Sequence, residues 1–146
     1  MTGSPYADSV AAIAAAWSSG WPAPAGVPVL WHHNGNDAVP SRATTQHWLH
    51  LAVEHSSERL VAFGGGRGAH EKELHGSVVI RVMAARGLGE ATQLILLDQA
   101  LAVFRSRRNG PLSFLGTSVI EMPGASADGA WWVRSGIAVF VYRFRG

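Results

Sequence analysis

Apolar and polar residues alternate from Glu73 to Val82, with the repeat of two that marks a half-buried β-strand. One face of this predicted strand is apolar, while the other is mainly polar and charged. The apolar face consists of Leu74, Gly76, Val78, Ile80 and Val82. We expect this face to form part of the hydrophobic core, with the rest of the chain packed against it and against the helix that follows.

The spacing becomes helical after a glycine-containing turn at residues 86–89. Apolar residues then recur every three or four positions, which predicts an amphipathic helix beginning near Glu90. The stripe consists of Leu94, Leu97, Leu101 and Phe104. We expect the helix to end near Arg108, because cations complement the negative end of the helix dipole and the following Asn109-Gly110 can adopt positive φ. Pro111 then prevents the helix from resuming.

The N-terminal segment has the signals of a helix start. Ser4 before Pro5 has the form of an N-cap followed by proline at the first helical position. One face at helical spacing carries Tyr6, Val10, Ile13 and Trp17. These features predict a helix over residues 5–18, followed by a proline-rich connector over residues 21–26.

Three extended segments are predicted between residues 29 and 63. Residues 29–34 form a short strand, placed at a sheet edge by Pro28 at its start. Residues 46–55 alternate and therefore favour a strand, although some of their apolar residues also fit a helix. Residues 59–63, after a break at Ser56-Ser57, form a separate short strand or an extended arm.

The C-terminal third predicts further strands over residues 112–122, 130–134 and 137–144, with a break at Ser135-Gly136. Residues 137–144 are apolar on both faces. This strand is therefore either central and covered on both sides, or has one face that awaits a partner. The adjacent Trp131 and Trp132 place one indole on each face, so one is expected in the core and the other exposed.

The element order predicts an α+β fold. We expect a single mixed, mostly antiparallel β-sheet with an N-terminal helix and a second central helix packed on one face. The chain has 146 residues, of which 47% are hydrophobic, which suffices for one core and is too short for two comfortable domains. The prediction is one domain over residues 1–146.

Composition narrows the classes of function. The formal net charge is only +2, Lys72 is the sole lysine and the arginines are scattered, so sequence-specific duplex nucleic-acid binding is disfavoured. Cysteine is absent, which excludes disulfides and thiolate metal sites. There is neither an apolar run long enough to span a bilayer nor a basic signal-peptide region, so we expect synthesis in the cytoplasm and no membrane association.

Seven histidines raise the possibility of a metal site. His47 and His55 share a face of their predicted strand but lie about 26 Å apart along it, too far to bind one ion. No His-Glu-x-x-His motif or two-histidine, one-carboxylate spacing occurs. We therefore favour surface or interface histidines over metal ligands.

Two glycine-rich stretches also lack ligand signatures. Residues 64–68 are not followed by Gly-Lys-Ser/Thr, and they lead into a strand where a phosphate loop would lead into a helix. Gly87 and Gly89 precede a helix without the third glycine of a dinucleotide fingerprint. No Gly-x-Ser-x-Gly motif is present. The prediction is no catalytic residue, cofactor or metal.

The order of the elements and several local patterns resemble the tail terminator, or tail completion, proteins of long-tailed phages and phage-like gene transfer agents. The resemblance covers nearly the whole chain. It rests first on the N-terminal helix, the proline-rich approach to Val29-Leu30-Trp31-His32-His33-Asn34, and the strand Trp48-Leu49-His50-Leu51-Ala52-Val53. It rests next on the strand His75-Gly76-Ser77-Val78-Val79-Ile80-Arg81-Val82, which leads through Gly87-Leu88-Gly89-Glu90 into the helix with Leu97-Asp98 and Phe104. The last part is the final strand, Val139-Phe140-Val141-Tyr142-Arg143-Phe144.

The resemblance implies a structural virion protein without catalytic residues. Such a protein forms a hexameric ring on the head-proximal end of the tail tube, stops tail polymerisation and joins the tail to the head connector. Its partners would be further copies of itself, the tail tube protein and the head–tail connector protein, with DNA passing through the lumen without sequence-specific binding. The expected location is the virion, at the head–tail junction.

Our candidates for the subunit or tail-tube interface are exposed aromatic, basic and loop residues. They are Trp48, His50, Gly65, Arg67, His70, Lys72, Trp132, Arg134, Phe140 and Tyr142. The nearest alternative function is another head–tail connector or minor tail protein. Alternatives from other classes are a small metal-binding enzyme using His32, His33, His50 or His75, and a single-strand-binding sheet using exposed aromatics such as Trp48.

Overall fold

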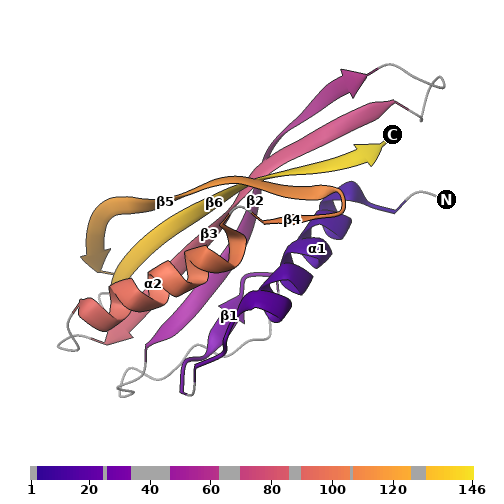
Figure 1. Cartoon of the computed structure of the whole chain (residues 1–146). Coiled ribbons are helices and arrows are strands. Elements are labelled where there is room, and N and C mark those ends of the chain that lie inside the picture. The colour runs from indigo at the N-terminus through magenta and orange to yellow at the C-terminus, as the bar shows by residue number, and fades with distance from the viewer. Residues whose placement is uncertain are drawn as a thin grey trace.

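The computed structural model describes residues 3–24, 26–33, 47–62, 70–85, 90–105, 107–125 and 131–146. Its elements are α1 (Pro5–Gly20), β1 (Val29–Trp31), β2 (Trp48–Ala62), β3 (Glu71–Ala85), α2 (Ala91–Phe104), β4 (Arg108–Asn109), β5 (Leu112–Ala125) and β6 (Trp131–Arg145). One sheet has the strand order β1-β2-β3-β6-β5-β4. β1 pairs with β2 in parallel and every other pairing is antiparallel. Both helices lie on the same side of the curled sheet (Figure 1). The predicted α+β fold is confirmed.

The first helix is confirmed, with an end two residues later than predicted. The Ser4 hydroxyl accepts a hydrogen bond from the Ala7 amide at 3.3 Å, which caps the helix. Ile13 and Trp17 are buried, as their spacing indicated, but Tyr6 is exposed. Tyr6 lies on the first turn, where its hydroxyl donates to Glu58 of β2 at 3.1 Å.

The core lies between the helices and one sheet face. The predicted apolar face of β3 is buried throughout: Leu74, Gly76, Val78, Ile80 and Val82. Three of the four predicted α2 residues also pack there, while Leu94 is exposed. The predicted stripe omits Leu96, Ala100 and Val103, which are buried, and also Gln93. Gln93 donates to the carbonyl oxygens of Val82 at 2.7 Å and Trp132 at 3.1 Å. This amide fastens the start of α2 to β3 and β6.

The predicted end of the second helix is wrong. α2 ends at Phe104, and the backbone of Arg105 is extended. Residues 108–109 form β4, and Gly110, with φ of 58°, lies in the turn between β4 and β5. Asn109 pairs with Leu112, so Gly110 and Pro111 form the two-residue hairpin loop, with the positive φ that glycine allows at its first position. Arg107 instead donates to the Val103 carbonyl at 3.3 Å and to the Ser19 hydroxyl at 2.6 Å, tying α2 to α1.

The predicted break in β2 is also wrong. The strand runs continuously from Trp48 to Ala62, with β-bulges between His55 and Ser57 and between Leu60 and Ala62. The bulges let the strand bend without ending. Residues 56–62 and the facing part of β3 form an extension of the sheet, called the arm below, which projects away from the helices (Figure 1). The similar break predicted at Ser135-Gly136 does not occur, because β6 is continuous.

The sheet face opposite the helices, called the outer face below, has a small core of its own. Trp48, Trp131 and Leu30 are buried there against Met83. The two indoles meet edge to face, with ring centroids 5.6 Å apart. Trp48 is therefore not the outward residue that we expected, because the edge strand β1 and the start of β6 cover it. Trp132, by contrast, is 45% exposed, so the prediction for the tryptophan pair holds.

β6 is a central strand between β3 and β5. Ala138 and Phe140 are fully buried beneath the helices. On the outer face Val141 is buried, but Val139 is exposed. The apolar character of both strand faces thus reflects a central position in the sheet together with an outer face that is only partly covered.

Candidate partner-binding site

The structure divides the predicted interface residues into separate groups. Gly65 and Arg67 lie outside the described residues. Trp48 and Phe140 are buried within the subunit, which corrects the expectation that they lie at its surface. The remaining residues are His50 on the outer face, Trp132 and Arg134 at the start of β6, and His70, Lys72 and Tyr142 at or near the arm.

The arm is supported by the end of β6. Glu71 pairs with Ala62 of β2 and with Arg145 of β6, and Lys72 pairs with Phe144. The amide of the last residue, Gly146, donates to the His70 carbonyl at 3.0 Å. The described part of the arm therefore has three strands along its whole length, which is more stable than an isolated two-stranded hairpin.

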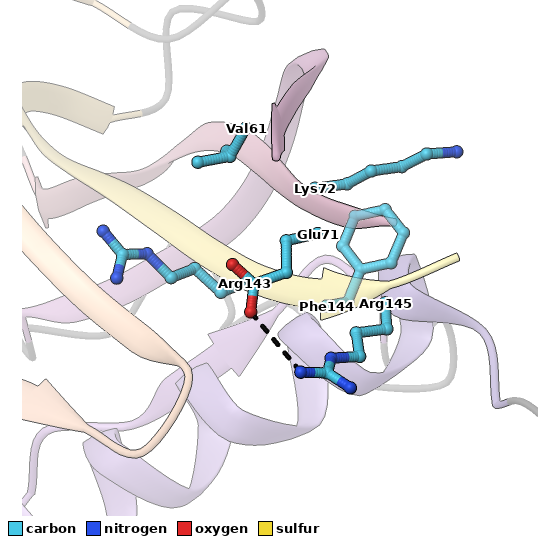
Figure 2. Close-up of a pocket in the computed structure, with 6 residues that line it drawn as sticks. All are labelled: Val61, Glu71, Lys72, Arg143, Phe144 and Arg145. Carbon is cyan, nitrogen blue, oxygen red and sulfur yellow. Dashed lines mark ion pairs between the residues drawn. The ribbon is translucent and has the colours of Figure 1, made fainter. Parts of the chain in front are cut away.

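A cavity of about 320 Å³ opens where these strand ends meet. It is lined by Val61, Glu71, Lys72, Arg143, Phe144 and Arg145 (Figure 2). Arg145 and Glu71 form an ion pair across its mouth, with an Nη2–Oε1 distance of 3.6 Å. In Figure 2 the Lys72 side chain extends away from this pair. Lys72 is half-exposed, and its role in an interface stays a prediction.

The arm combines charge with exposed apolar surface. Leu60 and Val61 are 41% and 50% exposed. Glu73 forms an ion pair with Arg143, with an Oε1–Nε distance of 3.4 Å, and its Oε2 lies 3.1 Å from His75 Nε2. Exposed apolar residues beside arginines are characteristic of protein interfaces, in which a few such residues carry most of the binding energy.

Of the residues that line this cavity, sequence reasoning named only Lys72 and missed Val61, Glu71, Arg143, Phe144 and Arg145. It did give residues 59–63 as a short strand or an extended arm. What the local pattern could not give is the pairing of the arm with the end of β6, where Glu71 pairs with Arg145, 74 positions along the chain. Three residues of the cavity come from β6 because of that pairing.

The start of β6 has a different arrangement. The Arg134 guanidinium forms an ion pair with Glu90, the residue before α2. The side chain of Arg134 is only 13% exposed, so it holds the beginning of α2 to the sheet. Trp132 is the accessible member of this pair of predicted residues.

Among the described residues, no three His, Asp or Glu side chains are placed to hold a metal ion. His32 and His50 are neighbours on the outer face, with ring centroids 5.7 Å apart. Burial lowers the pKa of His50, and the charges of the nearby Arg81 and His32 lower it further. His33 instead lies against Trp31, and His75 is paired with Glu73. The structure therefore brings together two of the four histidines of the metal alternative.

His55 joins β2 to the first helix. The buried Ser9 hydroxyl donates to the Tyr6 carbonyl at 2.7 Å and lies 2.9 Å from His55 Nε2. Because the hydroxyl proton is used, we assign Nε2 as the protonated nitrogen that donates to Ser9. The His55 ring also contacts Tyr6 and Phe140 edge to face.

We expect acid to weaken this joint. Burial lowers the pKa of His55, so neutral His55 favours the folded state above about pH 6.5, and this contribution is lost as the pH falls through the lowered folded-state pKa. Burial lowers the pKa of His47 and His50 in the same direction. The His55→Gln variant should therefore lose less unfolding free energy than the wild type between about pH 7 and pH 5, with a residual loss from the other two. Urea titrations at both pH values measure this, and equal losses in the two proteins would contradict it.

No family model matches the sequence, and no curated protein matches it. Solved structures do match. In one of them, whose name gives no function, the chain is 16% identical with a TM-score of 0.59, over 90% of this chain and 94% of the other. At that identity the likeness shows a shared fold alone. Within the described part of the chain, no helix has the length and apolarity needed to cross a membrane.

Proposed function

We propose that this protein is a tail terminator, a structural virion protein whose copies form a hexameric ring that caps the head-proximal end of a tail tube. The ring ends tail polymerisation and joins the tail to the head connector protein. DNA passes through its lumen without sequence-specific contacts. The observation that carries the proposal is the exposed arm, taken together with the sequence resemblance to this family.

The β2 part of the arm buries little surface within the subunit. Every residue of β2 from Ser56 to Ala62 is exposed, in contrast to the buried start of the same strand. Ordering an exposed strand costs conformational entropy, and the few contacts that the strand makes offset little of this cost. A second protein surface that covers Leu60 and Val61 would supply the missing burial.

The sheet also offers surface to neighbouring subunits. Both helices cover one face, so much of the outer face and the arm remain for contacts between subunits or with the tube (Figure 1). A cyclic ring uses two different surfaces of each subunit, because every copy contacts the next in a head-to-tail manner. The exposed Trp132 and the arm lie near opposite ends of the long strands β3 and β6 and could serve as two such surfaces.

A double variant tests the role of the arm. We expect Leu60→Asp with Val61→Asp to keep the circular-dichroism spectrum of the folded protein but to remain monomeric at micromolar concentrations where the wild type forms rings. Charges placed in a desolvated interface centre cost far more than at an exposed surface. Native mass spectrometry measures the change.

Ile95→Asp is the matched control, because Ile95 is also exposed but lies on α2. The Ile95→Asp variant should still form rings. If the arm variant assembles as well as the wild type, the arm is not a subunit interface and the proposal loses its main structural support.

A further inference from the structure

A second cavity, of about 490 Å³, lies on the outer face between the arm and β4. Its walls include Glu73, His75, Arg108, Ser113, Leu115 and Arg143. Three strand pairings place Arg108, Ser113, Val141 and His75 side by side in one row across the sheet. Directly paired residues project from the same face. Neither the predicted interface nor the proposed contacts of the arm involve this row.

Two arginine side chains of the cavity, Arg108 and Arg143, differ in their ion-pair contacts. Arg143 contacts Glu73 through Nε and is 64% exposed. Arg108 is exposed and has no ion-pair partner among the described residues. Arg107 also borders the cavity, but its guanidinium is held by Ser19 and Val103. Arg108 and Arg143 are thus the cations open to a ligand.

Ser113 and the buried Val141 form the floor between these arginines. Phe114 packs on the opposite, helix-covered face against Phe104, and Leu115, at a β-bulge, is 64% exposed beside the floor. From strand spacing and rise, the Arg108 and Arg143 Cα atoms lie two strands and two residues apart, about 12 Å. Side chains at positions i and i+4 of an extended peptide lie about 13 Å apart on one face, with position i+2 between them.

We infer that this cavity binds an acidic, extended segment of a partner protein, with carboxylates on Arg108 and Arg143 and the middle side chain over Ser113 of β5. Charge-assisted pairs with the two arginines supply the specificity. Glu73 holds Arg143 and His75 from one side of the cavity. The inference rests on the proposed function for the identity of the partner, a neighbouring protein of the tail.

The test uses a fluorescein-labelled peptide of sequence Glu-Ser-Leu-Ser-Glu and the full-length protein at low salt. We expect saturable binding with a Kd below about 1 mM, together with amide NMR shifts centred on Ser113, Val141 and His75. Arg108→Gln and Arg143→Gln should each weaken binding about tenfold, as expected for loss of one charge-assisted hydrogen bond. Arg105→Gln should change it less than twofold, because Arg105 is exposed and paired with Asp98 away from the cavity.

Three results would overturn the inference. They are no saturable binding, equal binding of the uncharged peptide Gln-Ser-Leu-Ser-Gln, and equal affinity of the two cavity variants and the wild type. Tighter binding of a single-stranded oligonucleotide that is lost in the same variants would also overturn it, in favour of a nucleic-acid site. Ring formation is measured separately. Rings without peptide binding would contradict this inference alone. Peptide binding by a strict monomer would contradict the proposed function and would still support the peptide-binding site.

Discussion

Replacing Gly76 with alanine is expected to lower the unfolding free energy by about 3 kcal/mol. A Cβ atom there would collide with the carbonyl oxygen of Glu54 and lie 2.8 Å from Cζ of Phe140. The Glu54 carbonyl belongs to the backbone of β2 and cannot move without disturbing the sheet. A urea titration should show a lower midpoint with an unchanged slope.

Gly116→Ala is the matched control, because a Cβ there meets nothing within 4 Å. Gly116 also lies in a strand of the same sheet, so the substitution is chemically identical. We expect its unfolding free energy to change by less than about 0.5 kcal/mol. Equal effects at the two positions would show that the close contact between Gly76 and Phe140 does not exist.

Replacing Phe140 with alanine is expected to cost about 3–5 kcal/mol, the usual loss for a fully buried aromatic residue. Phe140 is 0% exposed and packs edge to face against His55 and Phe114. A loss of this size is a large part of the total stability of a typical domain. Calorimetry or urea unfolding measures it directly.

Phe144→Ala, at the half-buried end of the same strand, provides the comparison. It should cost about 1 kcal/mol or less, while changing the surface of the arm cavity. If Phe140→Ala left stability intact and only prevented assembly, Phe140 would be an interface residue, as the sequence suggested, and its place in the core would be wrong.

The sequence correctly predicted those elements whose structure depends mainly on residues close by in the chain. The alternation in β3 identified its buried face because that strand is covered by helices on one side only. Ser4 and Pro5 predicted the start of α1 because capping involves neighbouring residues. The same reasoning gave the short β1 and the position of Trp132.

Long-range contacts account for the errors. Trp48 is buried by Trp131, a residue that the local pattern of β2 cannot reveal. Ser56-Ser57 suggested a break because a β-bulge and a chain turn favour similar residues. Asn109-Gly110 has the same sequence signal at a helix end and at a hairpin turn, and the pairing of β4 with β5 decides between them.

Lys72 and His70 border a glycine-rich stretch, and the structure places both at the far end of the described part of the arm. Their role in an interface stays a prediction. The cavity residues Arg143 and Arg145 reach the site through pairing of β6 with β3. The row through Arg108 depends on three strand pairings at once, which single-strand periodicity does not encode.

The central claim is that this chain is a ring subunit. Negative-stain imaging of the purified wild-type protein, with native mass spectrometry of the same sample, tests it most directly. The proposal predicts closed hexameric rings, and these rings should bind to one end only of isolated tail tubes. A protein that stays strictly monomeric at high concentration and leaves tail tubes uncapped would contradict it.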